Sequence, residues 1–181
     1  AKNGVHKSAY EVVSYGSQLA QKTGDTLTAL VIGEANNIAS LEDFGADKII
    51  HVKNDSLSSF QPTLLCKAIK QVASSEGSNT VIFSHDLTGK AIASMYAATE
   101  KAGIVTGAVA VPEVDNGFIV KKAVFSGKAY AHVKINTDKK VISVNPNSID
   151  KVENKKSAET SEINVDLGVG KIKVNEQKIE L

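Results

Sequence analysis

The sequence contains no arginine: all 21 of its basic residues are lysines, and they are interleaved with 20 acidic residues. Arginine carries the planar guanidinium that grips phosphates and carboxylates, and it is the commonest reader of guanine bases. Its absence argues against a chain that holds a nucleotide by itself. The net charge of +1 argues against a nucleic-acid-binding surface, which requires a cluster of positive charge.

Cysteine and long apolar runs are also scarce. Cys66 is the only cysteine, so no internal disulfide can form, and this usage fits a reducing compartment. The four histidines show no metal-ligand spacing with Cys66 or with acidic pairs, and we expect no metal site. No apolar run approaches the ~18 residues of a membrane-spanning helix, so we do not expect the chain to be embedded in a membrane.

The first half of the chain alternates between helical and strand patterns. A length of 181 residues fits one domain with an appended arm. Helical periodicity predicts helices over 7–22 and 60–75, a short helix over 40–44, and a further helix that ends near 102. Apolar runs predict strands over 26–32, 47–52 and 79–83. This alternation predicts an α/β fold, a three-layer sandwich with a mainly parallel sheet and right-handed crossovers.

The part from 102 to 147 is rich in strand patterns. Residues 109–111 are apolar, and Asp115-Asn116-Gly117 is a tight-turn signal. Further strands are predicted over 118–124, 130–135 and 141–144. Residues 148–161 are charged and polar, and they are interpreted as an exposed linker. The alternation over 163–181 is weak and predicts one or two edge strands or an extended arm.

The first predicted helix starts almost at Ala1, with no strand before it. In a parallel α/β sheet the first strand is usually central and apolar. We therefore expect an apolar strand upstream of Ala1.

One candidate site is the polar loop that leaves the strand at 79–83 and enters a helix. Loops at this position bind ligands in open α/β sheets, and helix N-termini attract anions. The alternative is an ordinary loop in which Asp86 or Thr88 caps the helix. The candidate residues are Ser84, His85, Asp86, Thr88, Gly89 and Lys90.

A second candidate site interrupts the strand-rich region. It consists of Phe125, Ser126, Gly127 and Lys128. Gly127 would let the backbone of a partner approach closely, whereas the alternative is a β-bulge that only bends a strand. Neither loop contains a catalytic constellation, and we do not expect the chain to be an enzyme.

Several segments, in this order, resemble the N-terminal domain of the alpha subunits of electron transfer flavoproteins. They are KSAYEVVSYGSQLA (7–20), LTALVIGEA (27–35), VIFSHDLTGKAIA (81–93), KAGIVTGAVAVPE (101–113), GFIVKKAVFSGKAYAHVKI (117–135) and KVISVNPNS (140–148). Two features of the family are missing. The family usually carries a Pro-Arg pair early in the helix after the Gly-Lys-Ala motif, and here Ser94 and Met95 or their neighbours stand at those positions. The FAD-binding C-terminal domain of the family is also absent.

The resemblance implies an adenine nucleotide alpha hydrolase-like fold over 1–147, followed by a linker and edge strands or an arm over 148–181. It implies a heterodimer with a beta subunit that carries AMP, and FAD mainly on the absent domain, so no cofactor is expected for this chain alone. The chain would be a scaffold on which the flavin domain sits, with the loops 84–90 and 125–128 facing that domain and the beta subunit.

In the family, electrons pass from acyl-CoA or other dehydrogenases to a quinone reductase. The resemblance places such a protein in the bacterial cytoplasm or in the mitochondrial matrix. The alternative is a stand-alone nucleotide-binding domain of the universal-stress-protein type. That class would be marked by a glycine-rich phosphate loop, which the sequence lacks.

Overall fold

The computed structural model describes residues 4–57, 60–168, 170, 172 and 175–176. The helices of these residues are α1 (Lys7–Thr23), α2 (Pro62–Ser75) and α3 (Leu87–Glu100), with the short 3-10 helices η1 (Ile38–Phe44), η2 (Asp55–Leu57) and η3 (Phe125–Gly127). The strands are β1 (Thr28–Ile32), β2 (Lys48–Val52), β3 (Thr80–Ser84), β4 (Gly103–Ala108), β5 (Phe118–Val124), β6 (Ala129–Ile135), β7 (Lys140–Val144) and β8 (Glu159–Ile163). Among these helices, none has the length and apolarity that a membrane span requires.

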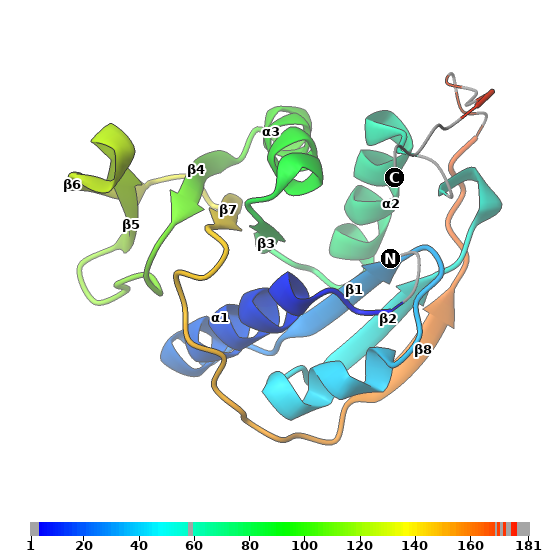
Figure 1. Ribbon diagram of the computed structural model, residues 1–181, viewed down its shortest axis with the longest axis horizontal. Helices are drawn as coiled ribbons and strands as arrows, with labels where there is room; N and C mark the ends of the chain where they lie inside the picture. The colour runs from blue at the N-terminus through cyan, green and yellow to red at the C-terminus, as the bar shows by residue number, and fades with distance from the viewer. Residues whose placement is uncertain (1–3, 58–59, 169, 171, 173–174, 177–181) are drawn as a thin grey trace.

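The strands form two sheets in the middle layer of the molecule (Figure 1). The smaller sheet has the order β1-β2-β8 and is entirely parallel. The larger has the order β3-β7-β4-β5-β6, in which β3, β7 and β4 are parallel and the β5–β6 hairpin is antiparallel. Helix α1 packs with η1 on one side, and α2 packs with α3 on the other. The predicted α/β three-layer class is confirmed.

Helix α1 follows its predicted bounds because both of its ends carry capping groups. The side chain of His6 accepts a hydrogen bond from the backbone N–H of Ser8, which is one of the free donors at the helix start. Gly24 ends the helix in the left-handed conformation (φ 75°) and donates to the carbonyl of Ala20. Tyr15, on the inner side of the helix, is completely buried.

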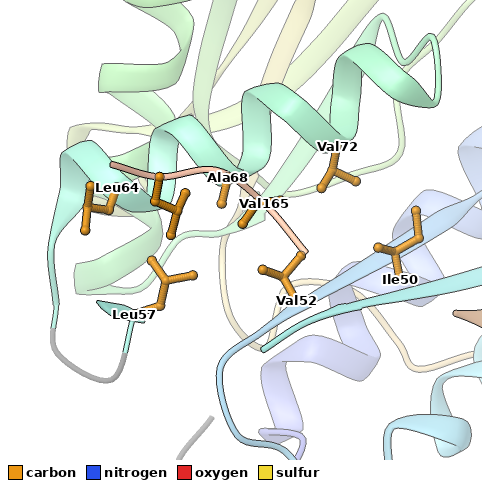
Figure 2. Close-up of a cluster of buried hydrophobic side chains, with 8 residues drawn as sticks. Ile50, Val52, Leu57, Leu64, Ala68, Val72 and Val165 are labelled. Carbon is orange, nitrogen blue, oxygen red and sulfur yellow. The ribbon is translucent and has the colours of Figure 1, made fainter. Parts of the chain in front are cut away.

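The core under α2 shows how helices cover the small sheet. Figure 2 shows Leu64, Ala68 and Val72 on one side of α2, above Ile50 and Val52 of β2. Leu57, Val165 and Leu167 complete this cluster, and all eight side chains are buried. Removing an apolar side chain of this size from water contributes about 1.5–3 kcal/mol. Residues beyond β8 therefore belong to the core of the molecule up to Leu167.

Two parts of the sequence-based prediction need correction. The strand before the β5–β6 hairpin lies at Gly103–Ala108, not at the apolar residues 109–111. Gly107 adopts a positive φ of 75°, and the pairing of β4 with β7 shifts its register there. Strand β8 begins at Glu159, inside the predicted linker, and it is an edge strand of the small sheet. The later alternating residues 169, 171, 173–174 and 177–181 lie outside the described residues.

Most side chains of the segment before β8 are exposed, but its backbone is held against the body of the protein. The backbone N–H of Val152 donates to the Ser14 hydroxyl at 2.9 Å. The backbone N–H groups of Asn154 and Lys156 donate to the carbonyls of Asp43 and Glu42 at 2.8 and 3.0 Å. We call residues 150–158 the strap. Its hydrogen bonds connect it to α1 and η1, and they lead the chain to the edge of β2.

We predict that Ser14→Ala destabilises the protein by about 1 kcal/mol, because the part-buried hydrogen bond from Val152 N–H to the Ser14 hydroxyl is lost. Ser14 is buried, and its hydroxyl also lies within hydrogen-bond distance of the carbonyls of Asp150 and Val152. Urea unfolding measures the loss, and hydrogen exchange at Val152 reports the release of the strap. Ser94→Ala, on the exposed side of α3, is the control. Equal stability of the two variants would contradict a role for Ser14 in holding the strap.

Candidate functional site

Both sequence-predicted loops lie at the same edge of the larger sheet. Strands β3, β7 and β4 are parallel, so their carboxyl ends meet at one edge. The first loop follows β3 at this edge. The second follows β5, in which Lys122 pairs with Ala108 at the carboxyl end of β4, three residues before Phe125. We call residues 84–90 and 125–128 together the carboxyl-edge surface.

The first loop is shaped by a helix cap. The carboxylate of Asp86 accepts a hydrogen bond from the backbone N–H of Gly89 at 2.7 Å, and the Asp86 carbonyl accepts from Lys90 N–H. This is the capping geometry that stabilises a helix start. A Cβ on Gly89 would lie 1.8 Å from the carbonyl oxygen of Ser84, so only glycine lets α3 start this close to β3. Asp86 and Gly89 are therefore occupied in building the loop, and Thr88 and Lys90 are its exposed polar members.

His85 joins the loop to the neighbouring strand. Its Nδ1 lies 2.8 Å from the hydroxyl of Ser143 in β7, and its backbone N–H donates to the carbonyl of Val144 at 2.8 Å. The Ser143 hydroxyl also accepts from the N–H of Gly107 in β4. Ser143 is fully buried, so this Ser–His pair cannot meet a substrate, and its role is to connect β3, β7 and β4.

The environment of His85 disfavours its charged form. The pKa of His85 lies below its ordinary value of 6.5. The main cause is burial, and the positive charges of Lys90 and Lys122 lower the pKa further. The carboxylate of Asp86 acts in the opposite direction. Lys90 lies in the first loop and Lys122 in strand β5, so positive charges approach His85 from two separate elements.

The second loop is a hairpin turn rather than a bulge. Strands β5 and β6 pair without a register shift from Phe118 with Ile135 to Val124 with Ala129. The turn closes through the N–H of Lys128, which donates to the carbonyl of Phe125 at 3.1 Å. The proposed alternative, a β-bulge within a strand, is therefore wrong.

The backbone of this turn is strained. Phe125 and Ser126 have φ values of 51° and 52°, a region that costs a non-glycine residue about 1–2 kcal/mol. Gly127 follows at 84°, and a Cβ there would meet no atom within 4 Å. Phe125 is exposed at the tip of the hairpin, and the space over Gly127 is open.

The carboxyl-edge surface carries the two most exposed large apolar side chains among the described residues. Leu87 is 90% exposed, and Phe125 is 80% exposed. Sequence reasoning missed Leu87 although a signal was present. The buried residues of α3 are Gly89, Ile92, Ala93, Tyr96 and Ala97, and helical spacing places Leu87 off that stripe. Leu87 therefore projects from α3 away from the residues that the helix buries.

The described residues contain no group of three or more His, Cys, Asp or Glu side chains that could hold a metal ion. The start of α3 is the loop that most resembles a phosphate site, but the Asp86 carboxylate occupies one of its backbone donors, the Gly89 N–H, and would repel a phosphate. This loop is therefore poorly suited to a flavin or nucleotide phosphate. The fold defines an α/β domain of the three-layer class.

Comparison with known proteins specifies which α/β domain this is. The family model of the electron transfer flavoprotein domain matches residues 1–167. The chain belongs to this family, whose name describes electron transfer. The resemblance to the N-terminal domain of the alpha subunits is thereby confirmed.

Two curated relatives are alpha subunits. The chain is 24% identical over 172 residues to the electron transfer flavoprotein subunit alpha of Bacillus subtilis (strain 168). The aligned region covers 94% of this chain and 52% of that protein. It is 26% identical over 133 residues to the electron transfer flavoprotein subunit alpha of Syntrophomonas wolfei subsp. wolfei (strain DSM 2245B / Goettingen). Here the aligned region covers 72% of this chain and 41% of that protein. The chain thus spans about half the length of the curated relatives that it matches.

We predict that the free energy of unfolding rises with pH as His85 loses its proton. Because the pKa of His85 is lower in the folded protein, the unfolded chain binds the proton more readily. Stability is therefore lost as the pH falls from the ordinary value of 6.5 through the lower folded pKa. Urea unfolding between about pH 5 and 8 measures this dependence. The variant His85→Gln should lose this pH dependence, whereas the control His132→Gln, in β6, should retain it. If the free energy of unfolding of His85→Gln varied with pH as in the wild type, His85 would not be its source.

Proposed function

We propose that the chain is the scaffold domain of an electron transfer flavoprotein alpha subunit. Together with a beta subunit it supports an FAD-carrying domain, and the assembly carries electrons from dehydrogenases, including acyl-CoA dehydrogenases, to a quinone reductase. The chain itself catalyses no reaction in this proposal. Its work is to place the flavin domain and the beta subunit relative to each other. The bacterial relatives favour the cytoplasm over the mitochondrial matrix for this chain.

The observation that carries the proposal is the pair of exposed apolar side chains on the carboxyl-edge surface. Leu87 opens α3 and Phe125 stands at the tip of the β5–β6 hairpin, so they come from separate elements of the same edge. Large apolar side chains surrounded by polar ones are typical of the centre of a protein interface. Thr88, Lys90, Ser126 and Lys128 supply the polar surroundings here, because all four are exposed.

The proposal assigns the cofactors to other parts of the assembly. FAD would lie mainly on the C-terminal domain of the alpha subunit, and AMP would lie in the beta subunit. Two observations support this division: the Gly89 N–H at the start of α3 is already bonded to Asp86, and the sequence has no guanidinium to hold a pyrophosphate with two parallel hydrogen bonds.

The alternative is a stand-alone nucleotide-binding domain of the universal-stress-protein type. It would share the α/β fold, but it would need backbone donors free to bind phosphate at a strand-to-helix loop. At the start of α3 the Gly89 donor is already taken by Asp86. The match of the electron transfer flavoprotein model to residues 1–167 also favours the first proposal.

The test is a pair of variants of the full-length alpha subunit, Leu87→Ser and Phe125→Ser, each combined with the beta subunit. Both side chains are largely exposed, so we expect changes in the stability of the chain to stay within about 0.5 kcal/mol. We expect each variant to weaken subunit association by about tenfold or more, measured by calorimetry, and to reduce flavin retention.

Val152→Ser is the matched control, because Val152 is an exposed apolar residue of the strap, away from the carboxyl edge. Wild-type affinity in both Leu87→Ser and Phe125→Ser would contradict this use of the surface. Failure of the wild-type chain to bind any beta subunit, or micromolar binding of ATP by the chain alone, would overturn the proposed function itself and favour the alternative.

A further inference from the structure

The β5–β6 hairpin carries positive charge only, although the chain as a whole is nearly neutral. Residues 116–137 contain four lysines, one histidine and no acidic residue. The lysines are Lys121, Lys122, Lys128 and Lys134, and none of them takes part in an ion pair among the described residues. The acidic residues closest in sequence, Asp115 and Asp138, flank the hairpin. The hairpin therefore concentrates positive charge that the chain itself does not neutralise.

Strand β6 is an open edge of the larger sheet. Within the described part of the chain it pairs only with β5, and Figure 1 shows the hairpin at one end of the molecule. Proteins usually guard such an edge with a short strand, a proline, a bulge or charges on the edge strand itself. Strand β6 is seven residues long, without proline or register shift, and carries one lysine. Its edge is regular enough to accept another strand.

The backbone bonds of β5 show which residues of β6 face the open edge. Ile119 exchanges two backbone hydrogen bonds with Glu113, and the carbonyl of Lys121 accepts from the N–H of Val109. The odd-numbered residues of β5 thus bond toward β4, and its even-numbered residues bond to β6, since antiparallel strands alternate in this way. Their partners in β6 are the odd-numbered residues. The backbone N–H and C=O groups of Tyr130, His132 and Lys134 therefore point to the open edge.

The side chains of the same residues form an exposed positive face. Tyr130, His132 and Lys134 alternate with partly buried neighbours, and all three are exposed. Lys121 of β5 is the register partner of His132, and its Nζ lies 4.2 Å from the centroid of the Tyr130 ring. This face thus holds two ammonium groups beside an imidazole. Like charges on one face of a sheet repel, and a carboxylate placed among them is favoured.

A strand added at this edge would have an alternating sequence. Its residues opposite Tyr130, His132 and Lys134 would bond to their backbones and share their face, because paired residues of antiparallel strands point to the same side. The intervening residues would lie beside Ala131 and Val133, and Val133 packs against the core of the larger sheet. Acidic side chains suit the first set of positions, and apolar side chains suit the second.

We propose that the free edge of β6 is a docking site for an extended acidic segment of a partner protein. The segment adds to the sheet as an antiparallel strand, bonded to the backbones of Tyr130, His132 and Lys134. Its carboxylates lie on the face that carries Lys121 and Lys134. None of these residues belongs to the carboxyl-edge surface, and the inference does not depend on the proposed electron-transfer role.

The first test uses the peptide acetyl-Glu-Val-Glu-Val-Glu-amide as a probe of the edge. Its control is the same peptide with an N-methyl group on the central glutamate, which keeps the charge but removes a backbone donor to β6. Hydrogen exchange is measured at the amides of Tyr130, His132 and Lys134. We expect saturating peptide to raise their protection by about fivefold or more, and the N-methylated peptide to raise it little. The amides of Ala131 and Val133, already bonded to β5, are the internal reference.

The second test measures the contribution of charge. The double variant Lys121→Gln with Lys134→Gln should bind the peptide about threefold to tenfold more weakly, since each exposed ion pair contributes about 0.2–1 kcal/mol. The matched control is Lys151→Gln with Lys155→Gln, which removes the same charge from exposed positions of the strap. We expect the control to bind as the wild type does. Equal affinity of the two double variants would contradict recognition of acidic side chains.

Three other results would overturn the proposal. Equal protection by the two peptides, or none by either, would show that no strand pairs with β6. Binding of the chain to vesicles of phosphatidylcholine and phosphatidylglycerol, with the amides unprotected by peptide, would indicate an anionic membrane instead. Protection of the amides of Tyr130, His132 and Lys134 without peptide, in a dimer of the chain or in a complex with a beta subunit, would show that another chain already occupies the edge.

Discussion

The structure depends on helices that pack across the separation between β1 and β3. Helix α1 contributes Val13 to the core of the small sheet and Tyr15 to the core of the large one. On the opposite side, the cluster built around Ile69 and Ile92 is contacted by residues of both β1 and β3. Because no strand pairing joins the two sheets among the described residues, apolar burial by these helices holds them together.

The same arrangement positions the carboxyl-edge surface. Helix α3 can start directly at the end of β3 because Gly89 leaves room for the Ser84 carbonyl, and this start turns Leu87 outward. The hydrogen bond of His85 to Ser143 fixes the loop against β7, while the strained hairpin turn presents Phe125. Rigid elements thus supply both apolar side chains, which suits a scaffold that must place larger partners without rearranging itself.

Local signals in the sequence predicted much of this fold and less of its assembly. Helix 7–22 and strand 118–124 agree with the structure because helical spacing and the Asp-Asn-Gly turn act over a few residues. Strand Glu159–Ile163 was missed because its polar sequence becomes a strand only by pairing with β2, more than a hundred residues earlier. Both loops of the candidate site were predicted, but the contact between His85 and Ser143 depends on the order of strands, which no local pattern contains.

The most direct test of this account is native-state hydrogen exchange at the amides of Ile50 in β2 and Ile142 in β7, across a series of low urea concentrations. Both residues are buried in inner strands of their own sheets. If the helices join the two sheets into one folding unit, both amides will exchange with the same free energy of opening and the same dependence on urea. Two different free energies, each with its own urea dependence, would show that the sheets open separately and would contradict the account.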